Sequence, residues 1–178
     1  MNVKMLRSVY VTAFVFCLAF ASTTTSGQTT SAPSEIIPAL RRAKAPDFTV
    51  TDVQGKPFRL AALKGRVVLL DFWAIACGGC KLELPWYVGF DQQYKSKGLS
   101  LVGLDMYGEA PDAVKSFAAA HQMQYPVAIG TDAIGDLYHL REMPLTVLID
   151  RQGRIAVSHS GVVDPKVFES DIQALLAE

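Results

Sequence analysis

Residues 67–80 read VVLLDFWAIACGGC, and this stretch decides the fold. Its first half, from Val67 to Trp73, is apolar apart from Asp71, which is typical of a central strand buried on both faces. The chain then turns at Cys77-Gly78-Gly79-Cys80 and continues with apolar residues at helical spacing as far as a stop signal at Lys97-Gly98. We therefore predict a buried strand that leads directly into a helix, with two cysteines where that helix starts.

Strand and helix patterns alternate through the rest of residues 45–178. Outside the central unit, strands are predicted near residues 48–51, 58–60, 99–104, 125–129, 145–150 and 155–160, and helices near residues 110–121, 133–139 and 164–177. This order predicts an α/β fold with a central mixed β-sheet flanked by helices.

The N-terminal stretch has a different character. Lys4 and Arg7 precede an apolar run from Val9 to Ala21, which ends in the small-x-small sequence Ala19-Phe20-Ala21. Such a pattern is typical of a secretory signal peptide, so residues 1–21 are predicted to be removed on export. An uncleaved N-terminal anchor is the alternative, although the run is shorter than the roughly 20 residues that a membrane span needs.

Residues 22–44 are rich in Ser and Thr at first and have no apolar core, so we expect a flexible linker that could act as a membrane tether. Half of the residues of the whole chain are apolar, which is enough for one globular domain, expected at residues 45–178. The chain has 17 basic and 17 acidic residues, which argues against a nucleic-acid partner.

Cys77 and Cys80 carry the predicted chemistry. Cys17 lies in the predicted signal segment, so an exported protein would keep only these two of its three cysteines. A helix N-terminus stabilises a thiolate through its free N–H groups and its partial positive charge, which makes Cys77 the expected nucleophile. The two-residue spacing lets Cys80 attack a mixed disulfide formed on Cys77 and release it.

Other interpretations of the cysteine pair are less favoured. A structural disulfide is allowed in an exported protein, but so small a loop constrains the unfolded chain little. A structural zinc site needs four ligands, and His121, His139 and His159 are scattered singly along the chain. A covalent haem site needs His directly after the second cysteine, where Lys81 stands.

Two segments carry a family resemblance. Residues 69–80 resemble the active-site segment of thioredoxins, and residues 143–153, MPLTVLIDRQG, resemble the segment that holds their cis-proline. The opening residues 45–48, APDF, and the extra helix and strand between Asp112 and Ile129 resemble the TlpA-like branch, which includes reductases of cytochrome c maturation, and the related AhpC/TSA group. The resemblance covers about residues 45–178 and implies a thioredoxin fold with an N-terminal hairpin and an inserted helix and strand.

The resemblance also implies roles for individual residues. Cys77 would attack and Cys80 would resolve, while Asp71 matches the buried acid that relays a proton to the resolving cysteine. Glu83 matches an acid of many TlpA-like reductases, although a solvated Glu at a helix start is equally ordinary. For substrate binding, the resemblance implies that Pro144 is the cis-proline and that Met143 offers backbone groups to a substrate peptide.

The active-site loop departs from the family pattern. Ala76 stands where Trp is usual before the first cysteine, Gly79 where thioredoxins have Pro, and Leu145 where Thr usually follows the cis-proline. Gly78-Gly79 is more flexible than Gly-Pro, and the small Ala76 would open a wider apolar contact surface beside Cys77. We therefore expect Ala76, Gly78 and Gly79 to contact the substrate.

The leading hypothesis is a disulfide reductase of exported proteins, with apocytochrome c as a candidate client, in the periplasm or at the outer face of the cytoplasmic membrane. No nicotinamide or flavin motif is present, so electrons would come from a membrane donor, and we expect no cofactor and no metal. A thiol peroxidase is one alternative, but Ala74 and Leu70 occupy the positions where that family needs Thr or Ser and Pro. The other is a copper-binding chaperone that uses Cys77, Cys80 and Met143.

Overall fold

The computed structural model describes residues 35–178. The signal peptide or anchor predicted for residues 1–21 and the first part of the predicted linker lie outside the described residues. Within residues 35–178, no helix has both the length and the apolar character needed to cross a membrane.

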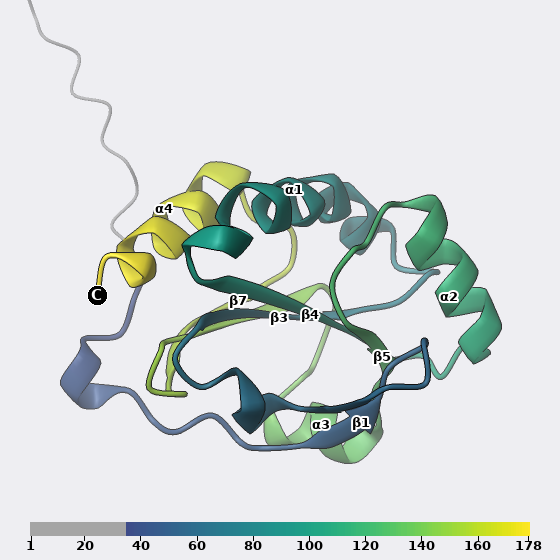
Figure 1. The fold of residues 1–178 in the computed structure, drawn as a ribbon, viewed down its shortest axis with the longest axis horizontal. Helices are drawn as coiled ribbons and strands as arrows, with labels where there is room; N and C mark the ends of the chain where they lie inside the picture. Colours follow the sequence, from purple (N-terminus) through teal and green to yellow (C-terminus); the bar gives the residue numbers. More distant parts are fainter. Residues whose placement is uncertain (1–34) are drawn as a thin grey trace, which may run out of the picture. The chain divides into compact units, whose positions relative to one another are not determined.

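A five-stranded mixed sheet forms the centre of the fold (Figure 1). β3 (Val67–Trp73) is its middle strand, parallel to β4 (Leu99–Asp105) and antiparallel to β6 (Leu145–Ile149). β5 (Val127–Ile129) continues the parallel side, and β7 (Ile155–Ser160) continues the antiparallel side. Every residue of β3 is buried, which confirms the central position predicted from its apolar run.

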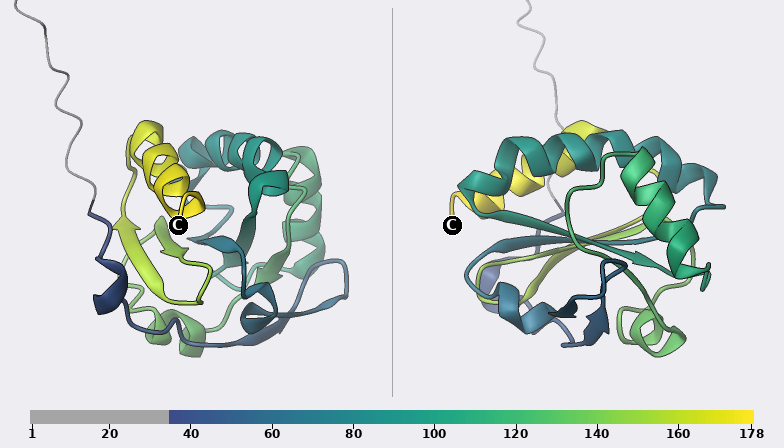
Figure 2. Two further views of the ribbon diagram at one scale, coloured as in Figure 1. Left: turned by 60° about the vertical axis from the view of Figure 1, so that its left-hand side comes forward. Right: turned by 45° about the vertical axis from the view of Figure 1, so that its right-hand side comes forward.

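Helices cover both faces of this sheet, as Figures 1 and 2 show. One face carries α1 (Gly78–Tyr94), α2 (Pro111–Ala120) and α4 (Pro165–Leu176). The other face carries α3 (Asp132–Leu137) and a small hairpin of β1 (Thr49–Thr51) and β2 (Pro57–Arg59). Short 3-10 helices complete the fold at Ala39–Arg41, Leu60–Leu63 and Lys95–Lys97. The predicted α/β fold with a mixed central sheet is therefore confirmed.

Side chains alternate between the two faces along β3, as they must in a strand. Leu69 and Trp73 pack in the apolar cluster that contains Cys80, whereas Leu70 and Phe72 pack in the cluster on the opposite face. Asp71 lies between Leu69 and Trp73 on the first of these faces. The pleat of the central strand therefore turns this acid toward the helix that carries the cysteines.

Residues 37–44, which were expected to belong to the linker, contact the domain. The Ile37 N–H donates to the Ala156 carbonyl at 2.8 Å. Arg42 is buried, and its guanidinium forms ion pairs with Asp150 at 3.0 Å and with Glu178 at 2.6 Å. The described fold thus extends N-terminal to the boundary expected at residue 45, because two carboxylates hold Arg42 in place.

Candidate active site

Cys77 and Cys80 form a disulfide at the N-terminus of α1, with an S–S distance of 2.07 Å. Cys77 is the N-cap residue of the helix, and its sulfur accepts the Cys80 N–H at 3.1 Å. Cys77 is half-buried, whereas Cys80 is 6% exposed and belongs to the core cluster. Cys77 is therefore the more accessible of the two cysteines to a large partner.

A cis-proline loop lies against the cysteine loop. The peptide bond between Met143 and Pro144 is cis, Pro144 is buried, and the Gly161 N–H donates to its carbonyl at 2.9 Å. A Cβ atom on Gly79 would lie 3.0 Å from Cδ of Pro144 and 2.9 Å from Cγ2 of Val162. Glycine at position 79 thus permits the close approach of the proline ring to the disulfide loop.

The remaining residues of the predicted contact surface differ in exposure. Ala76 and Gly78 are exposed on the cysteine loop, and Met143 is partly buried, where it packs against the cluster that contains Cys80. Apart from its chain neighbours and the backbone of its own helix, no heavy atom of residues 35–178 lies within 4 Å of the position that a Cβ would take on Gly78, so this side of the loop is open. The exposed backbone next to Cys77 can therefore receive a substrate chain.

Asp71 is buried beneath α1 and is 4% exposed. Its Oδ1 atom has no hydrogen-bond partner among the described residues. Burial raises the pKa of Asp71 well above the usual value, and the neighbouring charge of Glu83 raises it further. A carboxyl group in these surroundings holds its proton to a higher pH than a solvated one and can act as a proton carrier.

Glu83 is completely buried one turn along α1 from Cys80. Its Oε1 accepts the Val163 N–H at 3.0 Å, and its Oε2 accepts the Tyr87 hydroxyl at 2.8 Å. Burial raises the pKa of Glu83, although the two hydrogen bonds and the nearby His159 counteract this increase. The structure thus places Glu83 beside Asp71 in the interior and not on the solvated helix surface that was the ordinary alternative.

Tyr87 and Thr146 complete this interior group, and the sequence analysis missed both. The Tyr87 hydroxyl lies 2.6 Å from Oγ1 of Thr146, which stands opposite Asp71 in the pairing of β6 with β3. The position of Tyr87, four residues after Glu83, was a local signal because such side chains are neighbours on a helix. No local signal identifies Thr146, because its place depends on the register of two strands that are distant in sequence.

A second acid pair lies in front of Cys77. The Glu109 carboxylate accepts the Ile75 N–H at 3.2 Å, and the Asp105 carboxylate accepts the Glu109 N–H at 3.2 Å. Burial and the adjacent Glu109 raise the pKa of Asp105 to about 7. This pair holds the backbone that leads into the cysteine loop, and the sequence analysis did not identify it.

Exposed apolar side chains gather on the segments that border the disulfide. Leu82 is 62% exposed in the first turn of α1, and Val162, which faces Gly79, is 49% exposed. Tyr107 is 64% exposed in the loop whose Glu109 binds the backbone before Cys77. Together with Ala76, these side chains give the surroundings of Cys77 an apolar character.

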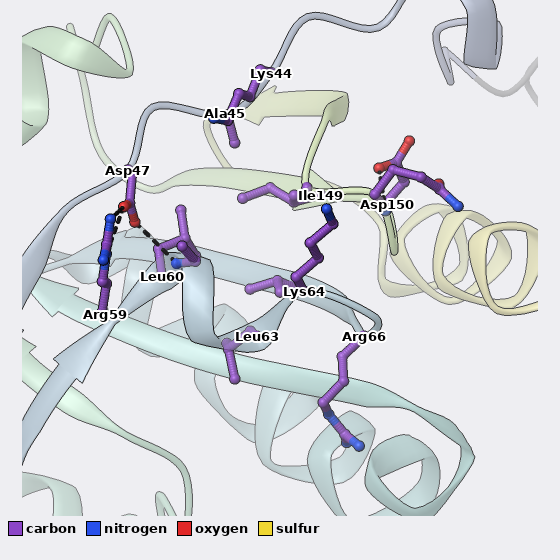
Figure 3. Close-up of a pocket in the computed structure, with 14 residues that line it drawn as sticks. Lys44, Ala45, Asp47, Arg59, Leu60, Leu63, Lys64, Arg66, Ile149 and Asp150 are labelled. Atoms are coloured by element: carbon purple, nitrogen blue, oxygen red, sulfur yellow. Dashed lines mark hydrogen bonds and ion pairs between the residues drawn. The ribbon is translucent and has the colours of Figure 1, made fainter.

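A separate cavity of about 210 Å³ lies at the opposite end of β3 (Figure 3). Val68, Lys64 and Ile149 help to line it, and no residue of the cysteine loop does. One of its carboxylates, Asp47, pairs with Arg59 at 2.6 Å (Figure 3). We assign none of the redox chemistry to this cavity.

Comparisons with known proteins find relatives of this chain. The sequence model of the AhpC/TSA family matches residues 42–158, a range that includes both cysteines and the cis-proline. A Bacillus cereus protein named thiol-disulfide oxidoreductase ResA is 36% identical over 134 residues, which cover 74% of this chain and 76% of that protein.

Solved structures from Chlorobium tepidum share the fold. One is described as thiol:disulfide interchange protein DsbE and is 35% identical, with a TM-score of 0.70 over 76% of this chain and 96% of its own. Another, described as a thiol:disulfide interchange protein of the thioredoxin family, is 27% identical, with a TM-score of 0.71 over 76% of this chain and 97% of its own. These likenesses confirm the thioredoxin fold expected from the sequence.

Proposed function

Since this chain belongs to the AhpC/TSA family of thioredoxin-fold proteins, we propose that it reduces disulfide bonds in exported proteins through its Cys77–Cys80 pair. Its general activity is thiol–disulfide oxidoreduction. The direction of electron flow, the client and the cellular location belong to the proposal. The observation that carries it is the half-exposed Cys77 at a helix N-terminus, with Cys80 and two acids buried behind it.

The reaction proceeds in two exchanges. The Cys77 thiolate attacks one sulfur of the client disulfide, which forms a mixed disulfide and releases the other client sulfur as a thiolate that takes up a proton. The Cys80 thiol then loses its proton to the buried carboxylate of Asp71, which is ionised in the reduced protein, and attacks the sulfur of Cys77. A bond forms between Cys77 and Cys80, and the client leaves as a dithiol.

A polypeptide client fits the surroundings of Cys77. Leu82, Tyr107 and Val162 present apolar surface around the disulfide, as a site for an extended or incompletely folded chain would. The backbone of Met143, beside the cis-proline, would pair with that chain in the way the family resemblance implies. A c-type cytochrome before haem attachment is a candidate client because its paired cysteines must be reduced for that attachment.

Regeneration of the dithiol needs an electron donor. No nicotinamide or flavin motif is present in the sequence, so we assign this role to a dithiol of a membrane protein. The predicted export signal at residues 1–21 supports a periplasmic location or a place at the outer face of the cytoplasmic membrane.

Peroxidase activity is expected to be weak. Ala74 stands three residues before Cys77, where a peroxidase needs a hydroxyl group, and it is completely buried as part of the core. Turnover of hydrogen peroxide and titration with copper(I) distinguish the two alternative functions from disulfide reduction, since each assay responds to one class of protein.

Reduction of insulin disulfides by the purified protein tests the proposal. The wild-type protein is expected to be active with dithiothreitol as the electron source, and Cys77→Ser is expected to lose this activity. Cys80→Ser is the matched variant, which should accumulate a mixed disulfide with the client because the resolving thiol is absent. Insulin reduction that persists in Cys77→Ser would exclude the mechanism.

A further inference from the structure

A buried hydroxyl bridge joins helix α1 to strand β6 behind the disulfide. The Tyr87 oxygen lies 2.8 Å from Oε2 of Glu83 and 2.6 Å from Oγ1 of Thr146. The Tyr87 side chain is 1% exposed, and its ring meets Phe168 edge to face, with centroids 5.5 Å apart. This packing fixes the hydroxyl between an acid on the helix and a residue two positions after the cis-proline.

The donors available to the two buried acids differ. A tyrosine hydroxyl has one proton to donate, and an ionised carboxylate only accepts. When Tyr87 donates to Glu83, Thr146 therefore donates to Tyr87. The second oxygen of Glu83 accepts the Val163 N–H at 3.0 Å, whereas Oδ1 of Asp71 has no partner among the described residues. Donated hydrogen bonds favour the charged form of a carboxyl group, so this arrangement favours ionised Glu83 and protonated Asp71.

We propose that Tyr87 is a positioning residue of the disulfide cycle, which holds the negative charge on Glu83 and thereby leaves Asp71 as the acid that carries the exchangeable proton. The charge of Glu83 raises the pKa of the buried Asp71, so two charged acids are unfavourable in this interior group, and the hydroxyl decides which acid is neutral. The inference rests on the disulfide cycle of the proposed function and is independent of its direction.

Asp71 gives up its proton when the disulfide between Cys77 and Cys80 is reduced. A thiolate of a donor dithiol attacks the Cys77 sulfur, the bond between Cys77 and Cys80 breaks, and its electron pair remains on Cys80. Asp71 supplies the proton that converts this thiolate to a thiol. The second donor thiol, once deprotonated, attacks the mixed disulfide, so the donor leaves oxidised and Cys77 leaves as a thiolate.

Among the other ionisable groups near this site, one favours the charged form of Glu83 and two phenols stay neutral. His159 on β7 stands opposite Thr146, contacts Asp171 of α4 at 2.9 Å, and lowers the pKa of Glu83. Burial keeps the pKa of Tyr125, a phenol influenced by Asp71, well above the usual value, and the same holds for Tyr87. Both phenols therefore remain neutral across the pH range in which the acids titrate.

The test is the pH dependence of disulfide reduction by dithiothreitol, followed by tryptophan fluorescence in the purified protein. In the wild type, the rate falls on the alkaline side as Asp71 loses its proton. Tyr87→Phe removes one hydrogen bond to the Glu83 carboxylate and so raises the pKa of Glu83 by roughly one unit, which makes the two acids share the last proton. The plateau rate should therefore fall, and the alkaline limb should move higher by at most about one pH unit. A plateau and a limb equal to those of the wild type would overturn the proposal.

Tyr94→Phe is the matched control on the same helix. The Tyr94 hydroxyl bonds Glu169 at 2.6 Å and Gln173 at 2.8 Å, which are residues of α4 outside the acid group. Its removal should leave the pH profile unchanged, and an equal shift in both variants would show a general effect of helix packing and overturn the proposal. Thr146→Val tests the bridge from its other end and should shift the alkaline limb by a smaller amount in the same direction. This variant also keeps the proposal testable if Tyr87→Phe does not fold.

Infrared spectroscopy identifies the protonated acid directly. At neutral pH, the carboxylic C=O band of the oxidised protein should lose intensity in Asp71→Asn and be unaffected in Glu83→Gln. In the Tyr87→Phe background, Glu83→Gln should also remove intensity, because the proton is then shared. A band that is insensitive to Asp71→Asn would contradict the inference. A protein that dithiothreitol reduces but that fails to reduce insulin would contradict the proposed function alone.

Discussion

Asp105 shows how a single buried side chain makes the protein sensitive to pH. It is completely buried at the end of β4 and has Glu109 beside it. Its pKa is about 7 in the folded protein against a usual value of 3.8, so the folded state retains a proton that the unfolded state has already released. Between these two values stability falls as the pH rises, because the folded state binds more protons there.

Asp105→Asn should therefore weaken the dependence of stability on pH. The amide resembles the protonated acid in shape and does not ionise. We expect the urea midpoint of the variant to fall less than that of the wild type between about pH 4.5 and pH 7.5, with Asp71 and Glu83 responsible for the remaining slope in the same direction. Glu109, whose pKa is lowered from 4.5, contributes only below this window.

Equal slopes for the wild type and Asp105→Asn would contradict this account. Such a result would mean that Asp105 is already ionised in the folded protein throughout the window. Urea unfolding of the oxidised protein at half-unit pH steps gives the comparison directly, since the disulfide does not change within the series.

At the level of the elements, the start of α1 depends on a close fit with the cis-proline loop. Gly79→Ala introduces a Cβ about 3 Å from Pro144 and Val162, and the proline ring cannot rotate away. Overpacking of this kind costs about 1–3 kcal/mol, so urea unfolding should show a loss of stability near the lower end of that range. Insulin reduction should also slow, because the disulfide loop is displaced from Pro144.

Gly78→Ala is the matched control for this contact. In the described part of the chain, only the neighbouring residues and the backbone of the same helix can lie within 4 Å of the added Cβ, and alanine favours the helix over glycine by roughly 0.5–1 kcal/mol. Its stability should equal or slightly exceed that of the wild type. If the two alanine variants lose stability equally, the cause is the flexibility of the loop and not the contact with Pro144.

The elements themselves were predictable because their signals are local. The apolar run of β3 and the helical spacing after Cys80 predicted both elements, and the predicted boundaries of the other elements differ by no more than two residues from those observed. The docking of Arg42 on Asp150 and Glu178 was not predictable, because its partners lie 108 and 136 residues away in the chain. Ser and Thr nearby suggested a linker, and no local pattern distinguishes a buried arginine from a solvated one.

The residues of the site also divide into those that the sequence signals locally and those that it does not. The spacing of the cysteines and the resemblance predicted Cys77, Cys80, Asp71 and Pro144 as site residues. The structure joins the two cysteines in a disulfide, places the cis-proline against Gly79 and buries Asp71. The link from Glu83 through Tyr87 to Thr146 depends on the register between β3 and β6, which a single sequence does not reveal. The hydrogen bond that Glu109 accepts from the Ile75 N–H depends on the path of an irregular loop.

For the molecule as a whole, the fold separates a partly exposed cysteine, Cys77, from a buried one, Cys80. The central strand β3 supplies Asp71, the loop before β6 supplies the cis-proline, and the start of helix α1 supplies both cysteines and Glu83. The packing of α1 on the sheet therefore assembles the groups that the proposed disulfide cycle uses.

The equilibrium reduction potential of Cys77 and Cys80, measured against a glutathione series in the purified protein, tests the central claim most directly. A disulfide reductase is predicted to have a potential of about −230 to −270 mV, which requires an electron donor that keeps the pair reduced. A potential near about −120 mV would make the protein an oxidant of exported thiols and would contradict the proposed direction of electron flow.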